Sequence, residues 1–308
     1  MSHSNHPTRR DFLCQSAFAG VAGAAALGAG PLFAADRAAG PTKYKKAVKI
    51  GMVEVRGSLA EKFQLLKELG FAGVELNSPG GPEPDEVQRA IDATGLIVHG
   101  VVDSTHWRTT LSDPNPSVRA EAVEDLKTAI RASKAYGGTS VLLVPAVVGE
   151  NATYEQAWER SIPEIKKALP LAEDEGIHVL MENVWNNFLT DAKETVRYLD
   201  ELDSKMVGAY FDVGNAVRYA PPVEWIRTLG NRIVKLDIKE YSNAKAKQEG
   251  DPGAGFRVEL LEGECDWPAV MDEMEKIEWS GWGTAEIPGG DRERLQEIAR
   301  RMDRIFAS

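Results

Sequence analysis

The sequence predicts an α/β protein built as a single (β/α)8 TIM barrel. Strand-like and helix-like segments alternate eight times between residues 47 and 308. Several helical segments end at a glycine directly before an apolar run, as in Leu69-Gly70-Phe71 and Thr94-Gly95-Leu96. About 270 residues is also the usual size of one such barrel. An open doubly wound sheet would need a glycine-rich phosphate loop after the first strand, and none follows residues 48–53.

The strand candidates are short apolar runs, which are typical of buried parallel strands. Helix candidates fill the gaps, and the first opens with a capping box, Ser58-Leu59-Ala60-Glu61. The strands are expected at 48–53, 73–76, 96–102, 140–144, 178–182, 208–212, 233–238 and 283–287. The helices are expected at 59–69, 85–94, 118–136, 155–175 (broken by Pro163 and Pro170), 190–202, 222–229, 267–277 and 291–306. Residues 241–256 form a long irregular stretch, either an active-site lid or a surface insertion.

The first 35 residues are predicted to be a twin-arginine signal peptide. Thr8-Arg9-Arg10-Asp11-Phe12-Leu13 precedes an Ala/Gly-rich stretch at 17–29, which is shorter than the roughly 20 residues of a membrane span. The alternative is a disordered or membrane-anchored N-terminus. The signal predicts a periplasmic or otherwise exported protein without a stable membrane anchor, with a linker at 36–46 and the barrel domain at 47–308.

The net charge of the chain argues against some classes of binding partner. The net charge is −11, and the two arginines and one aspartate of the leader leave −12 from Asp36 onward. Such an acidic chain argues against nucleic-acid binding and suits neutral small molecules or cations. Cys265 is the one cysteine after the leader, so no internal disulfide is expected, and it is interpreted as a packing residue.

Acidic residues close four consecutive strand candidates. The C-terminal ends of barrel strands are where such proteins do their chemistry. Acids gathered there would repel each other unless a positive charge, most simply a divalent cation, lay between them. Each acid could instead cap the following helix, and Asp212 is the strongest case. The four are Glu182, Asp212, Asp237 and Glu286, and Glu75 is a fifth acid at similar depth.

These strand ends resemble those of the sugar phosphate isomerase/epimerase superfamily with xylose isomerase-like barrels. The resemblance covers residues 47–305 and implies a divalent metal, commonly Mn²⁺, Co²⁺ or Mg²⁺, held by two Glu, one Asp and one His. It assigns Glu182 and Glu286 as acid/base catalysts and metal ligands, and Asp212 as a ligand. The motifs are Met181-Glu182-Asn183, Phe211-Asp212-Val213-Gly214-Asn215, Lys235-Leu236-Asp237, Ala285-Glu286-Ile287-Pro288 and the turn Gly263-Glu264-Cys265-Asp266-Trp267.

The chain departs from this pattern at two positions. The family's metal-binding His falls on Asp237, and a second His falls on Asn215. An all-carboxylate set favours hard cations, so Mn²⁺ or Mg²⁺ is expected. Lys235 and Lys239 share a strand face with Asp237. Neutralisation of Asp237 by one of these lysines, in place of the metal, is the alternative.

Other polar and aromatic residues near the strand ends are candidates for substrate binding. Trp107 could stack on a sugar and His106 could donate to its hydroxyls, although the two could also be a packing pair. Arg257 matches a position where relatives place a substrate-binding arginine. His99 is interpreted as a core residue and His178 as lying at the opposite end of the barrel. The candidates are Glu75, His106, Trp107, Trp185, Asn215, Lys235, Lys239 and Arg257.

Three functions are compatible with this pattern. The first is a metal-dependent isomerase or epimerase of a non-phosphorylated hydroxy-ketone sugar, with Glu182 and Glu286 transferring protons. The second is a lyase or hydrolase of keto-sugars or keto-glycosides on the same site. The third is a non-catalytic sugar-binding barrel. The sequence is also compatible with assembly into a homo-oligomer.

Overall fold

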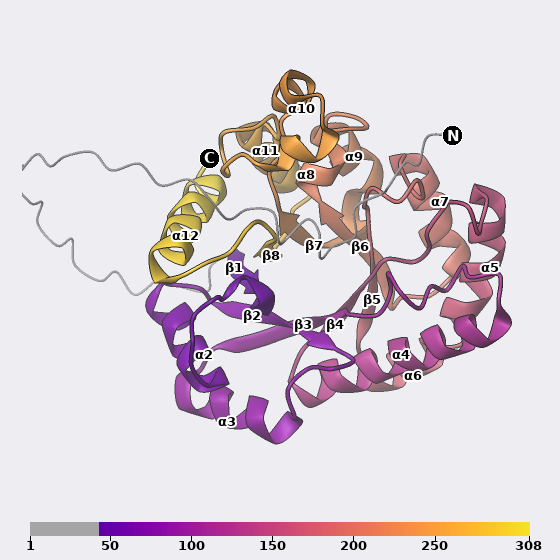
Figure 1. The fold of residues 1–308 in the computed structure, drawn as a ribbon, viewed down its shortest axis with the longest axis horizontal. Helices are drawn as coiled ribbons and strands as arrows, with labels where there is room; N and C mark the ends of the chain where they lie inside the picture. Colours follow the sequence, from indigo (N-terminus) through magenta and orange to yellow (C-terminus); the bar gives the residue numbers. More distant parts are fainter. Residues whose placement is uncertain (1–42) are drawn as a thin grey trace, which may run out of the picture. The chain divides into compact units, whose positions relative to one another are not determined.

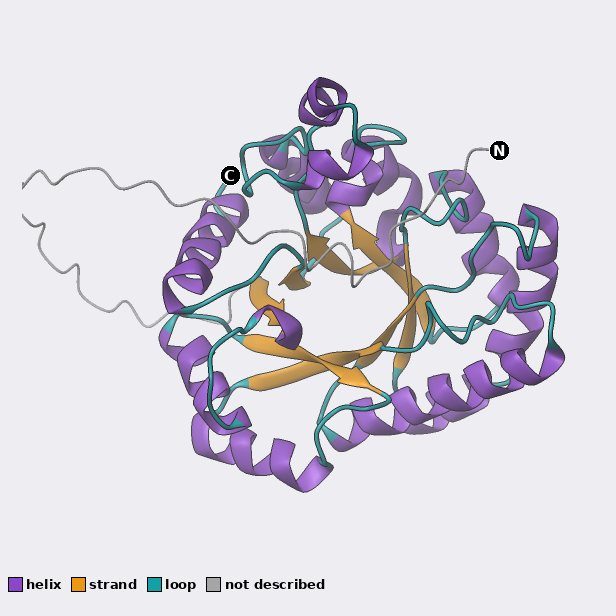
Figure 2. Cartoon of the chain, viewed as in Figure 1, coloured by secondary structure: helices purple, strands orange, loops and turns teal. Residues whose placement is uncertain are grey.

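A computed structural model describes residues 43–308, which form one closed barrel. Eight parallel strands pair in sequence order, β8 pairs with β1, and the helices surround them (Figure 1, Figure 2). The predicted fold class is therefore confirmed. The predicted leader at 1–35 and most of the linker lie outside the described residues. The strands are β1 Tyr44–Lys49, β2 Gly73–Ser78, β3 Ile97–Asp103, β4 Ser140–Leu143, β5 His178–Glu182, β6 Val207–Asp212, β7 Ile233–Ile238 and β8 Gly281–Ala285.

The predicted helices occur in the predicted order, but one of them is split and two short helices, at 213–216 and 243–249, were not predicted. The expected helix at 155–175 is two helices, and the break falls at Lys167 and Ala168, so Pro163 stays inside the first one. Pro170 lies in the first turn of the second, where a missing N–H costs nothing. The helices are α2 Leu59–Glu68, α3 Pro84–Thr94, α4 Pro116–Ala135, α5 Tyr154–Lys166, α6 Leu169–Glu175, α7 Ala192–Leu202, α8 Val213–Ala216, α9 Pro222–Leu229, α10 Asn243–Glu249, α11 Trp267–Lys276 and α12 Arg292–Phe306.

The first strand lies four residues earlier than predicted. β1 spans Tyr44–Lys49, and the expected second half of the strand is a 3-10 turn, Ile50–Met52. Lys45 and Lys46, which were assigned to the linker, belong to this strand, and each of their ammonium groups has a partner from the far end of the chain. Lys46 pairs with Asp303 of α12 at 2.6 Å, and Lys45 lies over the Trp282 ring. The shift places Lys49 at the C-terminal end of the strand.

The segment at 241–256 is folded, so its description as irregular was wrong. It contains α10 and a 3-10 helix, Pro252–Phe256. The backbone N–H of Ser242 donates to the Gly255 carbonyl at 3.0 Å, and the rings of Tyr241 and Phe256 lie 4.7 Å apart. Both ends of the segment are therefore held together beside β7.

Side chains fill the barrel beneath its C-terminal mouth. Val102, Leu142, Leu180 and Tyr210 form an apolar layer inside the barrel. His99 is buried, as predicted for a core residue, and stacks on Trp282 at 4.7 Å. The mouth is thus a site with a closed floor. Within residues 43–308, no helix has the length and apolarity needed to cross a membrane.

Candidate active site

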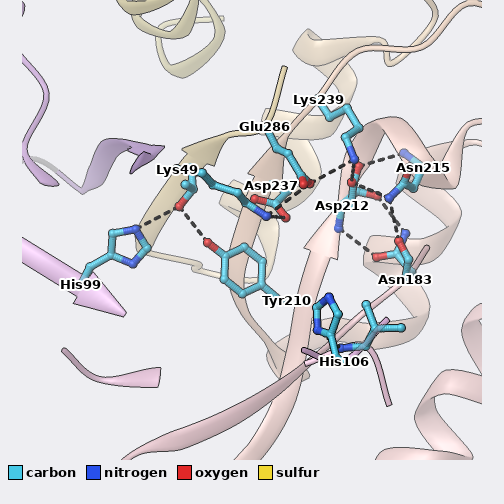
Figure 3. A network of polar contacts seen from close by, with 12 residues as sticks. Lys49, His99, His106, Asn183, Tyr210, Asp212, Asn215, Asp237, Lys239 and Glu286 are labelled. Carbon is cyan, nitrogen blue, oxygen red and sulfur yellow. Dashed lines mark hydrogen bonds and ion pairs between the residues drawn. The ribbon is translucent and has the colours of Figure 1, made fainter. Parts of the chain in front are cut away.

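Four carboxylates converge at the mouth of the barrel. Glu182 ends β5, Asp212 ends β6, Asp237 lies in β7 and Glu286 follows β8 directly. One oxygen from each lies within 4.8 Å of the others, and only Glu286 is more than marginally exposed. We call these four residues the carboxylate cluster. Figure 3 shows Asp212, Asp237 and Glu286 of this set with the polar side chains around them.

Strand pairing and one asparagine align the cluster. Asp212 and Asp237 are register partners on β6 and β7, so their side chains emerge on the same face. Asn183 follows Glu182 and bridges to the neighbouring strand. Its Oδ1 accepts from the Asp212 N–H at 2.8 Å, and its Nδ2 donates to the Asp212 carbonyl at 2.9 Å. These two bonds fix the end of β5 against the end of β6.

Asp212 is both a cluster member and a helix cap. Its Oδ1 accepts from the backbone N–H of Asn215 at 2.8 Å, and this bond starts α8. Its Oδ2 accepts from Asn215 Nδ2 at 2.5 Å. The capping alternative is therefore correct for this residue without removing it from the site. Asn215 holds Asp212 in place, and its contact with a substrate stays a prediction.

Two lysines enter the cluster, and one of them was not predicted. Lys49 Nζ lies 2.9 Å from Asp237 Oδ2 and 3.2 Å from Glu286 Oε2. Lys239 Nζ lies 2.8 Å from Asp212 Oδ2 and 3.0 Å from Glu286 Oε2. The alternative in which Lys235 or Lys239 neutralises Asp237 is therefore wrong.

The error comes from depth along the strand. Alternate residues of a strand share a face but are roughly 6.6 Å apart along it. Lys235 lies deeper in the barrel, where its Nζ is 2.9 Å from His99 Nδ1 and 2.7 Å from the His99 carbonyl. Lys239 lies beyond Asp237 and turns towards β6. The cation that reaches Asp237 comes instead from β1, which barrel closure brings next to β8.

The electrostatics of the cluster favour added positive charge. Burial, reinforced by the neighbouring Glu286 carboxylate, raises the pKa of Glu182 to about 8. Burial also raises the pKa of Asp212 and, more strongly, that of Asp237, although Lys239 and Lys49 oppose these shifts. Burial alone would lower the pKa of both lysines, but the carboxylates raise it above the ordinary value. Four carboxylates and two ammonium groups carry a formal charge of −2.

The donor set fits one divalent cation. Asp237 Oδ1 is buried and accepts no hydrogen bond from the residues at 43–308, while its other oxygen binds Lys49. A buried carboxylate oxygen without a donor is costly unless a cation approaches it. Oxygen ligands of this kind suit hard cations such as Mg²⁺, Mn²⁺ or Ca²⁺. Glu182, Asp212, Asp237 and Glu286 would hold the ion, whose identity the donor set leaves open.

Glu75 is not one of the four acids that meet within 4.8 Å, and its contact with a substrate stays a prediction. It is fully buried in β2, in register with Lys49 of β1. Burial raises the pKa of Glu75, and the charges of Lys49 and Lys235 oppose this shift. The residue therefore belongs to the polar interior between these two lysines.

An aromatic group lies beside the cluster. Trp185 packs against Tyr241 at 4.9 Å and Phe256 at 4.5 Å, and its Nε1 donates to the Asn215 carbonyl. The Phe256 ring lies 5.5 Å from Lys239 Nζ. The folded segment at 241–256 therefore contacts the site, as a lid would. Arg257 pairs with Glu249 and Asp251 of that segment, and its role in substrate binding stays a prediction.

His106 and Trp107 make the contact expected of a packing pair. Their rings meet edge to face at 5.7 Å. The His106 ring, labelled in Figure 3, accepts at Nδ1 from the Val144 N–H at 3.1 Å. Trp107 is nevertheless 40% exposed, in contrast to the buried tryptophans of the core. Its exposed face suits stacking on a sugar, which stays a prediction.

Sequence reasoning missed Lys49 and Asn183. Lys49 was placed near the start of a strand, at the end of the barrel far from the chemistry. Alternation along the true strand, with Ala47 and Lys49 on one face, could have placed it inward. Asn183 adjoins Glu182 in a quoted motif, but its bonds to Asp212 depend on strand pairing.

The Asp103→Asn variant should gain stability relative to the parent as the pH rises. Asp103 ends β3, and burial raises its pKa to about 6. The folded state therefore keeps this proton to higher pH than the unfolded chain does. The stability contribution is present below about pH 4 and is lost as the pH rises through 6, by about 3 kcal/mol. Urea unfolding at pH 4.5 to 8 measures the change.

The exposed acid Asp85 provides the control for this effect. Asp85→Asn should differ from the parent by a small amount at every pH. A constant difference between Asp103→Asn and the parent across the same range would contradict the shifted pKa.

The fold and the site together define a class of protein. A closed parallel barrel with paired glutamates among clustered carboxylates at its C-terminal mouth has the parts for metal-assisted proton transfer. The chain belongs to the xylose isomerase-like TIM barrel family, whose sequence model matches residues 63–305. This match confirms the family resemblance inferred from the motifs.

Several known proteins of similar sequence or structure are sugar epimerases. L-ribulose-5-phosphate 3-epimerase UlaE of Escherichia coli strain K12 is 23% identical over 289 residues, covering 86% of this chain and 93% of the relative. The structure of D-allulose 3-epimerase from Methylomonas sp. with D-allulose has a TM-score of 0.69 at 15% identity, covering 86% and 97%. E. coli 3-keto-D-glucoside 4-epimerase YcjR also gives 0.69 at 15%, covering 86% and 99%. These relatives support the expected isomerase or epimerase class.

Proposed function

We propose that the chain is a divalent-metal-dependent isomerase or epimerase of a non-phosphorylated hydroxy-ketone sugar. The observation that carries the proposal is the meeting of Glu182 and Glu286 with two further carboxylates within 4.8 Å at the barrel mouth. Two carboxylates from different strands can approach a bound sugar from different sides. The epimerases among the relatives support the same reaction class.

The residues of this chain have distinct tasks in the proposed reaction. Glu182, Asp212, Asp237 and Glu286 would hold a divalent cation, which would polarise the ketone and acidify the adjacent C–H. One of Glu182 and Glu286 removes that proton, and the other returns a proton to the opposite face. Asn183 and Asn215 keep Asp212 in position. The aromatic group at Trp185 helps to exclude water from the site.

The charges around the site support a neutral sugar as substrate. Lys49 and Lys239 are held by the carboxylates, and Arg257 is paired with Glu249 and Asp251. These three cations are therefore engaged rather than available to a phosphate group. A non-phosphorylated substrate also agrees with the proposed export through the twin-arginine pathway, which rests on the motif at residues 8–13 and the Ala/Gly-rich stretch after it.

Chelation should abolish the proposed activity. The purified protein is incubated in D₂O with a panel of free ketoses, and the products are analysed by NMR and mass spectrometry. We expect an isomeric sugar carrying one deuterium. Treatment with EDTA should lower the rate by at least about 100-fold, because carbonyl polarisation is worth several kcal/mol, and Mn²⁺ or Mg²⁺ should restore it.

The products separate the three functions. A deuterated isomer with metal dependence supports the proposal. Released water or aglycone would replace it with the lyase or hydrolase alternative. Sugar binding without turnover, together with no measurable uptake of a divalent ion, would leave the non-catalytic barrel.

A further inference from the structure

The carboxylate cluster already contains two cations of its own. Glu286 Oε2 contacts both Lys49 Nζ at 3.2 Å and Lys239 Nζ at 3.0 Å. Each ammonium group has a second carboxylate partner, Asp237 for Lys49 and Asp212 for Lys239. Two lysines thus join three acids into one continuous chain of ion pairs (Figure 3).

Both lysines are fully engaged in these ion pairs. Their side chains are 8% and 14% exposed, and buried ammonium groups are rare unless paired. Lys49 comes from β1 and Lys239 follows β7, the two strands that flank β8. They therefore approach Glu286 from its two sides. Such an arrangement opposes the mutual repulsion of the acids.

The ammonium groups also contact oxygens that a metal would use. Each nitrogen lies 2.8–3.2 Å from oxygens of two different carboxylates. Oxygens of all four acids fall within 4.8 Å of one another, so the space between them is small. A lysine and a metal therefore draw on the same negative charge.

We propose that Lys49 and Lys239 are built-in counter-ions of the carboxylate cluster. They keep the acids in place without a divalent cation and limit the cluster to a formal charge of −2, which one such cation neutralises. The proposal rests on the metal site that the proposed function requires. It adds that these lysines weaken metal binding while stabilising the metal-free protein.

Single lysine variants test both halves of this proposal. Parent, Lys49→Met and Lys239→Met are freed of metal with a chelator, titrated with MnCl₂ by calorimetry, and melted with and without Mn²⁺. Each variant should bind Mn²⁺ at least about tenfold more tightly than the parent, because the cluster then carries −3. The melting temperature of each metal-free variant should be lower than that of the metal-free parent. The rise in melting temperature on adding Mn²⁺ should be larger than in the parent.

Lys235→Met is the matched control, since it removes a buried lysine of the same strand that bonds to His99 instead of the cluster. Its Mn²⁺ affinity should stay within about threefold of the parent. If Lys239→Met does not fold without a cation, Lys49→Met, which keeps all four carboxylates, gives the same comparison.

Three outcomes would overturn the proposal: equal or weaker Mn²⁺ binding in the lysine variants, unchanged metal-free stability, or no Mn²⁺ binding by any of these proteins. Tight binding that appears only after a lysine is removed would support it. All these measurements are made without a sugar. Failure of the proposed epimerase activity would therefore show in the deuterium experiment and leave this test unaffected.

Discussion

Glu182→Gln should lower epimer formation by about 10²–10⁴-fold, the usual contribution of a positioned acid or base. Glutamine has the same shape but neither takes up nor releases a proton near neutral pH. The substitution also removes a buried carboxyl whose pKa is raised to about 8 by burial and by Glu286, so the fold should persist. The rate is measured by NMR with the active ketose in D₂O.

Deuterium exchange refines this prediction. Exchange into the epimer whose C–H faces Glu182 should disappear in Glu182→Gln, and Glu286→Gln should lose exchange into the opposite epimer. Glu164→Gln is the control, because Glu164 is buried but pairs with Arg119 outside the barrel. Exchange retained from both epimers in Glu182→Gln would exclude its role in proton transfer.

Glu240→Ala should lower the free energy of unfolding by about 3–5 kcal/mol, the largest stability effect expected here. Glu240 follows β7 and is 2% exposed. Its Oε2 accepts from the Leu261 N–H and from Trp267 Nε1, both at 2.8 Å, and its Oε1 accepts from the Cys265 N–H at 3.2 Å. Alanine leaves these donors without an acceptor. Urea unfolding measures the loss.

The matched control is Glu259→Ala, in which a partly exposed acid loses its pair with Arg294. Surface pairs of this kind contribute at most about 1 kcal/mol. Glu240→Gln, which keeps one acceptor oxygen, should fall between the two. A loss below 1 kcal/mol for Glu240→Ala would show that water replaces the carboxylate without cost.

The periodic pattern of the chain predicted the barrel well. β5 and β7 match their predicted ranges, and the others differ mainly at their ends. The reason is that apolar runs bounded by helix-ending glycines encode buried strands locally. β1 is the exception, since its first half is rich in lysine and its side chains contact Trp282 and Asp303 from the far end of the chain.

The site was predictable for residues whose position follows from their own strand. Glu182, Asp212, Asp237 and Glu286 end or follow apolar runs, so their meeting at the mouth follows from parallel strands alone. The pairing of lysines with acids was not predictable in this way. It depends on which neighbouring strand lies within reach of a long side chain.

The sequence by itself determined the eight-fold alternation, the C-terminal gathering of acids and their excess negative charge. Only the tertiary structure decided how that charge is offset. Lys49 and Asp237 are 188 residues apart in the chain, and barrel closure brings them to 2.9 Å. Lys235, two residues from Asp237, is directed to His99 instead. Ion pairs form between groups that are close in space, and the sequence pattern of a single strand does not give distances across a closed barrel.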